Sequence, residues 1–277
     1  PGPTVTISAP STSFTWVGNA IAQTGNWTDP ALWNPTGTVP NNTGLSTYAA
    51  QINLGTVTIP TATDITLNSL FLLGGTINGG GTLSLAGTDS SWTAGALSNL
   101  KSLTIAPGAQ LTASTNNAHN FGGTAVINQG TFRWVDGGTL SSGTNVTFNN
   151  ALGGTFTDAS TAGNDRVITN GFGDTFAFTN AGTYQKTVSG STTRIEVPFT
   201  NTGNILLDAG TLRFTSTFTQ TSGLLRLASG TTAVFDNALL FPAGSLIGSG
   251  TLTGNVTHGA ATGPTATLSP GDKLGQL

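Results

Sequence analysis

Apolar and polar residues alternate along this chain in short runs, which is the pattern of β-strands that bury one face. The clearest apolar pairs are Leu83/Leu85, Phe132/Trp134, Val146/Phe148, Phe176/Phe178, Ile195/Val197, Leu212/Phe214 and Leu225/Leu227. The polar side chains within and beside these runs are expected to face water, namely Arg133, Thr147, Arg194, Glu196, Arg213 and Arg226. The pattern therefore predicts many short strands that share one buried face.

The strands recur in a loose repeat of about 20 residues, a period typical of stacked architectures. Its clearest copies are Phe178-Thr-Asn-Ala-Gly-Thr-Tyr184, Phe199-Thr-Asn-Thr-Gly-Asn-Ile205 and Phe218-Thr-Gln-Thr-Ser-Gly-Leu224. Weaker copies begin at Ile127 and Phe148, and the longer interval between Phe148 and Phe178 predicts an inserted loop. One repeat is long enough for three short strands joined by bends.

Three short strands per repeat predict a right-handed parallel β-helix, an all-β solenoid in which each coil pairs with the next. Phe, Leu, Ile and Val are expected to stack inside, Thr to cover the outer faces, and Gly to supply positive φ at bends. Asn at bends is expected to adopt left-handed backbone angles and to hydrogen-bond along a ladder of like side chains. The alternative fold is a β-sandwich, against which the repeat argues.

The placement of Gly and Pro divides the chain and excludes a helical domain. The longest stretches without either residue, 61–73 and 109–121, have 13 residues and are rich in Thr and Asn. We expect an extended N-terminal strand over residues 1–15, a Trp-rich cap or first coil over 16–54, and β-helix coils over 55–277.

Composition and charge exclude several classes of partner. Only 7% of the residues are charged and the net charge is −3, so the chain has neither the basic stripe that nucleic acid requires nor a polybasic patch for membranes. No apolar run approaches the roughly 18 residues of a membrane span. The absence of Cys excludes disulfides and thiol chemistry. The absence of Met indicates a processed product or a fragment. The low charge, the absence of Cys and Met and the processing together favour a secreted, extracellular or cell-surface bacterial protein.

Residues that could support catalysis or metal binding are sparse. The two histidines, His119 and His258, lie far apart without nearby carboxylates, so both are expected in solvated loops and neither a metal nor a cofactor is predicted. The densest charge comprises Asp158, Asp165, Arg166, Asp174, Lys186, Arg194 and Glu196. A polysaccharide lyase could use it, with Asp174 near Arg194, but ordinary turn chemistry explains Asp165 and Asp174 better. The other charges are expected to form ordinary, weak ion pairs at the surface. No catalytic residue is predicted.

Aromatic residues gather near the N-terminus, where Trp16, Trp27, Trp33 and Tyr48 lie within one short segment. Such a cluster either packs beneath a cap that covers the first coil of a solenoid or stacks on the sugar rings of a glycan. The packing role is the simpler expectation, and these four residues are the candidate glycan site.

The two ends of the predicted solenoid are the candidate subunit interface. The segment Thr4-Val-Thr-Ile-Ser8 alternates like a strand, which makes Val5 and Ile7 candidates for pairing either with the chain's own first coil or with the next subunit. At the other end, Leu268 and Leu274 lie in a segment with strand patterning and no visible cap. A head-to-tail contact between such ends propagates as a filament.

Several short motifs resemble those of a known group of proteins. They are Trp16-Val-Gly-Asn19, Gly25-Asn-Trp-Thr-Asp-Pro30, Trp33-Asn34, Val39-Pro-Asn41 and the turn Leu268-Ser-Pro-Gly271. With the Gly- and Thr-rich strands that follow, the chain resembles bacterial surface proteins with autotransporter-like β-helix repeats. The resemblance implies a secreted or cell-surface β-helix with an adhesive or structural role.

The sequence thus favours a non-catalytic, extracellular structural β-solenoid that assembles head to tail into a homopolymer, a surface filament or matrix element. The alternatives are a monomeric adhesin or stalk that binds glycan through its Trp residues and, less favoured, the polysaccharide lyase.

Overall fold

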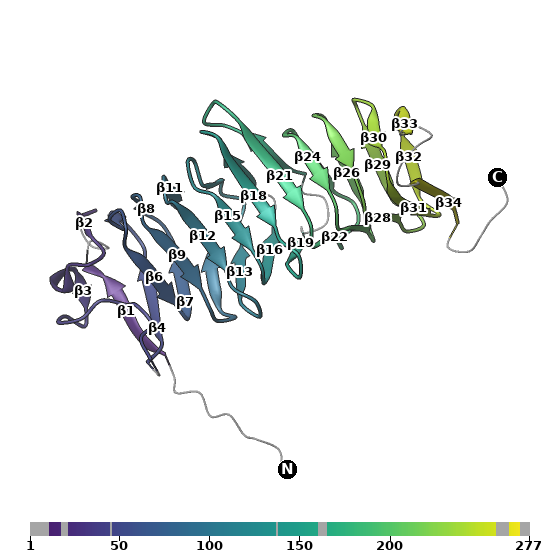
Figure 1. The fold of residues 1–277 in the computed structure, drawn as a ribbon. Helices are drawn as coiled ribbons and strands as arrows, with labels where there is room; N and C mark the ends of the chain where they lie inside the picture. Colours follow the sequence, from purple (N-terminus) through teal and green to yellow (C-terminus); the bar gives the residue numbers. More distant parts are fainter. Residues whose placement is uncertain are drawn as a thin grey trace, which may run out of the picture.

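In the computed structural model the chain forms a parallel β-helix of three long sheets, stacked coil upon coil (Figure 1). The structure describes residues 11–17, 22–44, 46–136, 138–159, 165–258 and 266–271. The first coils and the last coils lie at opposite ends of an elongated body (Figure 1). The fold class predicted from the sequence is confirmed, and the β-sandwich is excluded.

The strands are short and each sheet takes about one strand from every coil. In stacking order, sheet 1 contains β3 (Trp33–Asn34), β1 (Thr12–Trp16), β4 (Tyr48–Ile52), β7 (Ser69–Leu72), β10 (Ser90–Trp92), β13 (Gln110–Ala113), β16 (Thr131–Val135), β19 (Thr155–Ala159), β22 (Thr183–Lys186), β25 (Asn204–Leu207), β28 (Leu224–Leu227), β31 (Gly244–Gly248) and β34 (Ala266–Pro270). Sheet 2 contains β2 (Thr24–Asn26), β5 (Thr56–Thr58), β8 (Thr76–Asn78), β11 (Ala96–Ser98), β14 (His119–Asn120), β17 (Thr139–Ser142), β20 (Arg166–Asn170), β23 (Thr192–Ile195), β26 (Thr211–Phe214), β29 (Thr232–Phe235) and β32 (Thr251–Thr253). Sheet 3 contains β6 (Asp64–Leu67), β9 (Thr82–Leu85), β12 (Ser102–Ile105), β15 (Val126–Asn128), β18 (Val146–Asn150), β21 (Phe176–Asn180), β24 (Phe199–Asn201), β27 (Phe218–Gln220), β30 (Leu239–Phe241) and β33 (Val256–His258). A short 3-10 helix, η2 (Pro30–Leu32), precedes β3.

The alternation of apolar and polar residues positions the side chains as the sequence predicted. Within the strands, alternate residues are buried in the interior, and the polar residues between them are exposed or half-buried. Of the side chains expected to face water, Thr147 and Arg226 are half-buried and the others are exposed, namely Arg133, Arg194, Glu196 and Arg213.

Aromatic rings stack along the interior because the coils pair in register. In sheet 3, Phe148, Phe178 and Phe199 lie face to face with ring centroids 4.8 Å apart at each step, and Phe218 continues the column at 5.6 Å. A second column of stacked rings lies in sheet 1 and contains Phe132, Phe156 and Tyr184. Rings held in register contribute packing contacts beyond the area that they bury.

A ladder of buried amide side chains runs beside the aromatic column at the last position of successive sheet 3 strands. Each amide nitrogen donates to the oxygen of the next side chain, over distances of 2.7, 2.6, 2.7 and 3.2 Å. The members, in order, are Asn128, Asn150, Asn180, Asn201 and Gln220. The predicted ladder is therefore present, but its asparagines do not have the left-handed angles expected, since positive φ occurs instead at other positions such as Asn99 and Asn145.

The ladder also locates the predicted insertion. Bonded ladder residues are separated by 22, 21 and 19 positions, but Asn150 and Asn180 are separated by 30. The additional residues lie between β18 and β21, in a region that includes the undescribed residues 160–164.

The glycine of the repeat Asn-x-Gly is required by the close stacking of the bends. A Cβ atom on Gly182 would lie 2.1 Å from the carbonyl oxygen of Gly154, and one on Gly203 would lie 2.1 Å from that of Gly182. Neither glycine can be replaced without moving the backbone of the coil beneath. Each recurring feature of the repeat thus has a structural role: the aromatic residue packs in the interior, the amide joins the ladder, and the glycine allows the bends to stack closely.

Asn180→Ala is expected to destabilise the protein by about 2–3 kcal/mol, because it leaves buried amide groups of Asn150 and Asn201 without their partners. Asn149→Ala is the matched control, since Asn149 is half-buried and accepts one bond from Thr179 on the outer face, and it should cost less than about 1 kcal/mol. Urea unfolding followed by circular dichroism measures both. Equal losses would show that the ladder is not a special source of stability.

Candidate functional site

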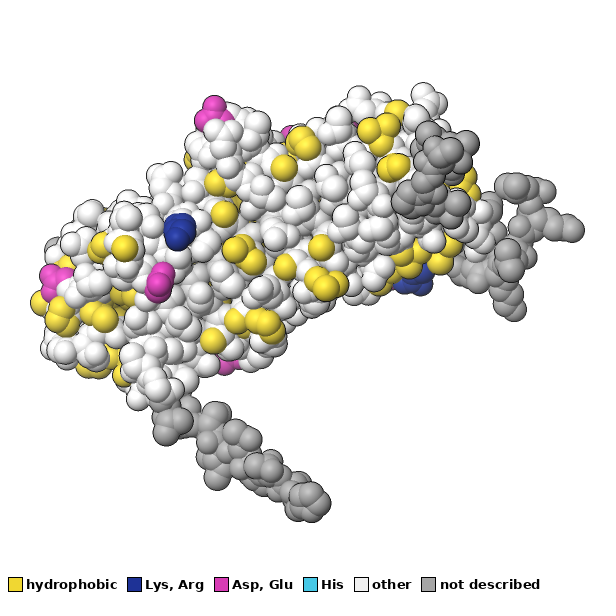
Figure 2. All heavy atoms as spheres, viewed as in Figure 1, with side chains coloured by type: hydrophobic (Ala, Val, Ile, Leu, Met, Phe, Trp, Pro, Cys, Tyr) yellow, Lys and Arg dark blue, Asp and Glu magenta, His cyan; other side chains and the backbone are white. Residues whose placement is uncertain are grey.

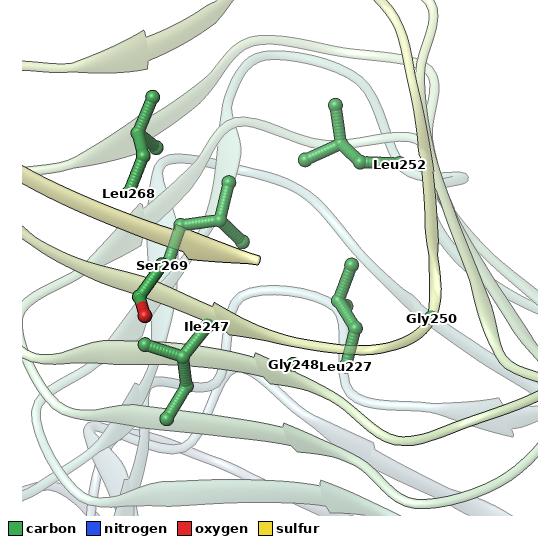
Figure 3. Close-up of a pocket in the computed structure, with 8 residues that line it drawn as sticks. Leu227, Ile247, Gly248, Gly250, Leu252, Leu268 and Ser269 are labelled. Atoms are coloured by element: carbon green, nitrogen blue, oxygen red, sulfur yellow. The ribbon is translucent and has the colours of Figure 1, made fainter. Parts of the chain in front are cut away.

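The last described coils form an open apolar pocket of about 220 Å³ at the C-terminal end of the solenoid (Figure 3). Leucines from three successive coils line it, and Leu268 on β34 is 53% exposed although it continues a buried column. The lining residues are Leu227, Leu246, Ile247, Gly248, Gly250, Leu252, Leu268 and Ser269. Core positions are therefore open to contact at this end.

The residues Leu268, Ser269 and Pro270, which the sequence assigned to a turn, belong to the strand β34 instead. Leu268 pairs with Leu246 in parallel register, and β34 is the last strand of sheet 1 among the described residues. Gly271 has a φ of 93°, and its N–H donates to the carbonyl oxygen of Gly248 over 2.7 Å. This bond holds the end of β34 beside Gly248, which lines the apolar pocket.

The N-terminal end differs, because polar and aromatic groups cover its first strands. The short strand β3 pairs antiparallel with β1 at the edge of sheet 1. At the edge of sheet 3, the side chain of Asn41 bonds the backbone of Asp64 and Thr66, and the N–H of Asn42 donates to the carbonyl oxygen of Thr66. These contacts satisfy backbone groups of β6 that would otherwise lack partners.

The candidate glycan residues lie within this covered end. Trp16, Trp27 and Trp33 are each 0% exposed and pack ring against ring, with centroids 5.2 and 4.8 Å apart. The indole N–H of Trp27 donates to the carbonyl oxygen of Pro40, and that of Trp33 to the carbonyl oxygen of Trp27. Tyr48 is half-buried against Phe14. Buried rings offer no face to a sugar, so the burial favours the packing role over the glycan role.

Of the four candidate interface residues, Leu268 alone can be located, at the pocket of the C-terminal end. Val5, Ile7 and Leu274 lie outside the described residues.

Charged residues that the sequence suggested for the surface form a buried cluster inside the solenoid. Asp158 on β19, Arg166 on β20 and Lys186 on β22 have side chains that are fully buried. One carboxylate oxygen of Asp158 lies 3.3 Å from a guanidinium nitrogen of Arg166, and the other lies 3.5 Å from Lys186 Nζ. Arg166 also lies over the ring of Trp134, 4.5 Å from its centroid.

Hydrogen bonds hold the cluster in place. Lys186 Nζ donates to the hydroxyl oxygens of Ser191 and Thr193, each over 3.0 Å. Tyr184 and Thr193 donate their hydroxyl protons to the same oxygen of Asp158. Burial lowers the pKa of Lys186 and raises the pKa of Tyr184 well above its usual value, because each charged form loses its hydration.

Ion pairs also lie on the outer surface, whereas Asp165 accepts a hydrogen bond from the backbone N–H of Thr192. Arg194 pairs with Glu196 at 3.4 Å and Arg213 with Asp236 at 3.0 Å. Asp174 occupies a turn with a φ of 53°, as its turn chemistry predicted. The ion pair of Arg194 is therefore with Glu196, and the structure records none with Asp174 among the described residues.

The expectation that His119 lies in a solvated loop is wrong. His119 is fully buried, its Nε2–H donates to the carbonyl oxygen of Trp92 over 2.9 Å, and its ring packs edge-on against the Trp92 indole. Its strand register pairs it with Leu140, a core residue, which is why it points inward. The backbone of His258 lies in β33.

Among the described residues, no three His, Cys, Asp or Glu side chains gather where they could hold a metal ion. Nor does the described part of the chain contain a helix with the length and apolar character needed to cross a membrane. The chain matches no protein-family model, no curated protein and no solved structure.

His119 predicts a loss of stability in acid. Burial, with a smaller contribution from the charge of Arg166, lowers its pKa below the ordinary 6.5. As the pH falls below 6.5, the unfolded chain binds a proton at this residue while the folded protein does not, so the free energy of unfolding decreases until the lowered pKa is reached.

Thermal unfolding at a series of pH values above and below 6.5 measures this effect. His119→Gln should flatten the dependence, whereas His258→Gln serves as the control for the chain's other histidine. An unchanged pH dependence in His119→Gln would contradict the assignment.

Proposed function

We propose that this protein is a non-catalytic structural β-helix of an extracellular or cell-surface assembly, whose copies associate head to tail. The observation that carries the proposal is the difference between the two ends. The N-terminal coils are covered by Trp rings and by Asn41, while the last described coils present an apolar pocket and the edge of β34. An exposed strand edge beside apolar side chains favours strand addition.

The sides of the solenoid support a structural role. The face in Figure 2 shows mostly backbone and side chains that are neither hydrophobic nor charged, with hydrophobic groups spread among them and a few scattered charges. Within the interior, the strongest ionic groups, Asp158, Arg166 and Lys186, are enclosed and bonded to one another, away from any substrate. Low charge, the absence of Cys and the resemblance to bacterial surface proteins with β-helix repeats support an extracellular location.

A polar groove favours glycan binding as the second candidate function. It measures about 480 Å³, lies on sheet 2 and is lined by Thr139, Asp165, Arg166, Val167, Thr192, Arg194 and Arg213. The hydroxyl groups and the exposed guanidinium groups of Arg194 and Arg213 are suitable donors to sugar hydroxyls and carboxylates, whereas the guanidinium group of Arg166 is buried. On this hypothesis Arg213→Ala lowers retention of the protein on an immobilised glycan, and the alternative fails if the parent protein is not retained on any glycan of a panel.

Assembly is tested by size-exclusion chromatography over a range of concentrations and by negative-stain electron microscopy. We expect filaments or concentration-dependent oligomers, and we expect Leu268→Asp to reduce them because it places a charge in the apolar end. Leu152→Asp is the matched control, since Leu152 is 87% exposed on a lateral turn. Monomers at every concentration, or equal loss of assembly in both variants, would contradict head-to-tail association through this end.

A further inference from the structure

A lysine and an aspartate face each other inside the solenoid from neighbouring coils. Asp158 on β19 and Lys186 on β22 are register partners in sheet 1, so the backbone itself holds the two side chains side by side. Lys186 Nζ lies 3.5 Å from Asp158 Oδ2, and both side chains are 0% exposed. An amine and a carboxyl group fixed at this separation have a high effective concentration for reaction with each other.

The two oxygens of Asp158 have different partners. Oδ1 accepts a hydrogen bond from Arg166, a cation that would stabilise negative charge developing on this oxygen. Oδ2 accepts from the hydroxyl groups of Tyr184 and Thr193. Thr193 in turn accepts a hydrogen bond from Lys186 Nζ, so a continuous path for a proton leads from the amine to Oδ2.

We propose that Lys186 and Asp158 condense to form an isopeptide bond between the two coils. A proton passes from the ammonium group of Lys186 to Oδ2 through Thr193, which gives an amine and a carboxylic acid. The nitrogen lone pair attacks Cγ of Asp158, and the Nζ–Cγ bond forms while negative charge gathers on Oδ1 beside Arg166. The Cγ–Oδ2 bond then breaks, Oδ2 takes a second proton from the nitrogen, and one water molecule leaves.

Burial favours each part of this reaction. It lowers the pKa of Lys186, which increases the fraction of the nucleophilic amine, and it keeps Tyr184 protonated as a donor. Two opposite charges are costly to keep in an interior that excludes water, and condensation replaces them with one neutral amide. The net charge of the cluster stays the same, and Arg166 retains its bond to the carbonyl oxygen of Trp134 and its contact with the Trp134 ring.

The bond would join the coil that contains the 30-residue interval between Asn150 and Asn180 to the next coil. In a stacked fold each coil contacts only its neighbours, so a covalent link between two coils limits how far unravelling can spread. It would also close a loop in the unfolded chain, which reduces the conformational entropy of that state.

Mass spectrometry of the intact, denatured full chain tests the proposal. We expect a mass below that of the sequence by one water molecule, the same deficit in Lys101→Arg, and no deficit in Lys186→Arg. Lys101 is exposed, so Lys101→Arg leaves the cluster intact. It is the matched control because it removes one lysine, as Lys186→Arg does. A parent mass equal to that of the sequence, or a deficit that persists in Lys186→Arg, would overturn the proposal.

A tryptic digest of the parent protein decides the question even if Lys186→Arg fails to fold. Trypsin does not cleave after an acylated lysine, so we expect residues 134–166 joined covalently to residues 167–194. Complete release of a peptide 167–186 that ends at a free Lys186 would overturn the proposal. Arg166→Met should slow the appearance of the cross-linked species in freshly folded protein, a change in rate that a purely structural role of Arg166 does not predict.

Discussion

Pairing of each coil's backbone with the coils on either side is the constraint on which the structure depends. Parallel pairing in register places each side chain next to its counterpart one coil away, so every interior column must tolerate close contact between successive residues. Phe stacks on Phe and Asn donates to Asn, because like side chains meet this requirement with little adjustment. The bends meet it with glycines such as Gly182 and Gly203, at which a Cβ would collide with the coil beneath.

The same constraint explains why a charged cluster can exist in an otherwise apolar interior. Asp158 and Lys186 occupy one column of sheet 1, directly above Trp134. The column thus brings an anion beside a cation, and Arg166 enters from sheet 2 to pair with the same carboxylate. A lone charge at this depth would be strongly destabilising, whereas paired and hydrogen-bonded groups can be accommodated. The arrangement concentrates ionisable groups in the interior, where their side chains have no exposed surface.

Much of the fold was predictable from the sequence, and the alternation of apolar and polar residues also indicated which charged side chains point inward. The repeat led to the parallel β-helix and to the amide ladder. The charged cluster and His119 were expected at the surface because charged residues and lone histidines usually lie there. Yet each charged residue of the cluster lies two positions from a buried core residue of the same strand, so its side chain points inward. The pairs are Asp158 with Phe156, Lys186 with Tyr184, and Arg166 with Ile168. His119 carries the same signal, since it is two residues from the buried Phe121. Its pairing with Leu140 in a strand of only two residues agrees with this inward direction. The Trp residues posed the opposite problem, since no pattern in the sequence distinguishes a ring packed under a cap from one exposed to a ligand.

The register of the coils is tested most directly by disulfide trapping, for which the Cys-free chain is well suited. Thr200 and Thr219 are partners on β24 and β27 and are both half-buried on the outer face, so cysteines at these two positions should form a disulfide rapidly on mild oxidation. Cysteines at Thr200 and Thr217 are the control, because Thr217 lies two residues out of register and its Cα is too distant for an unstrained disulfide. We expect trapping of the first pair and not of the second. Equal trapping of both pairs, or trapping of the second alone, would contradict the stacked register from which the fold, the ladder and the buried cluster follow.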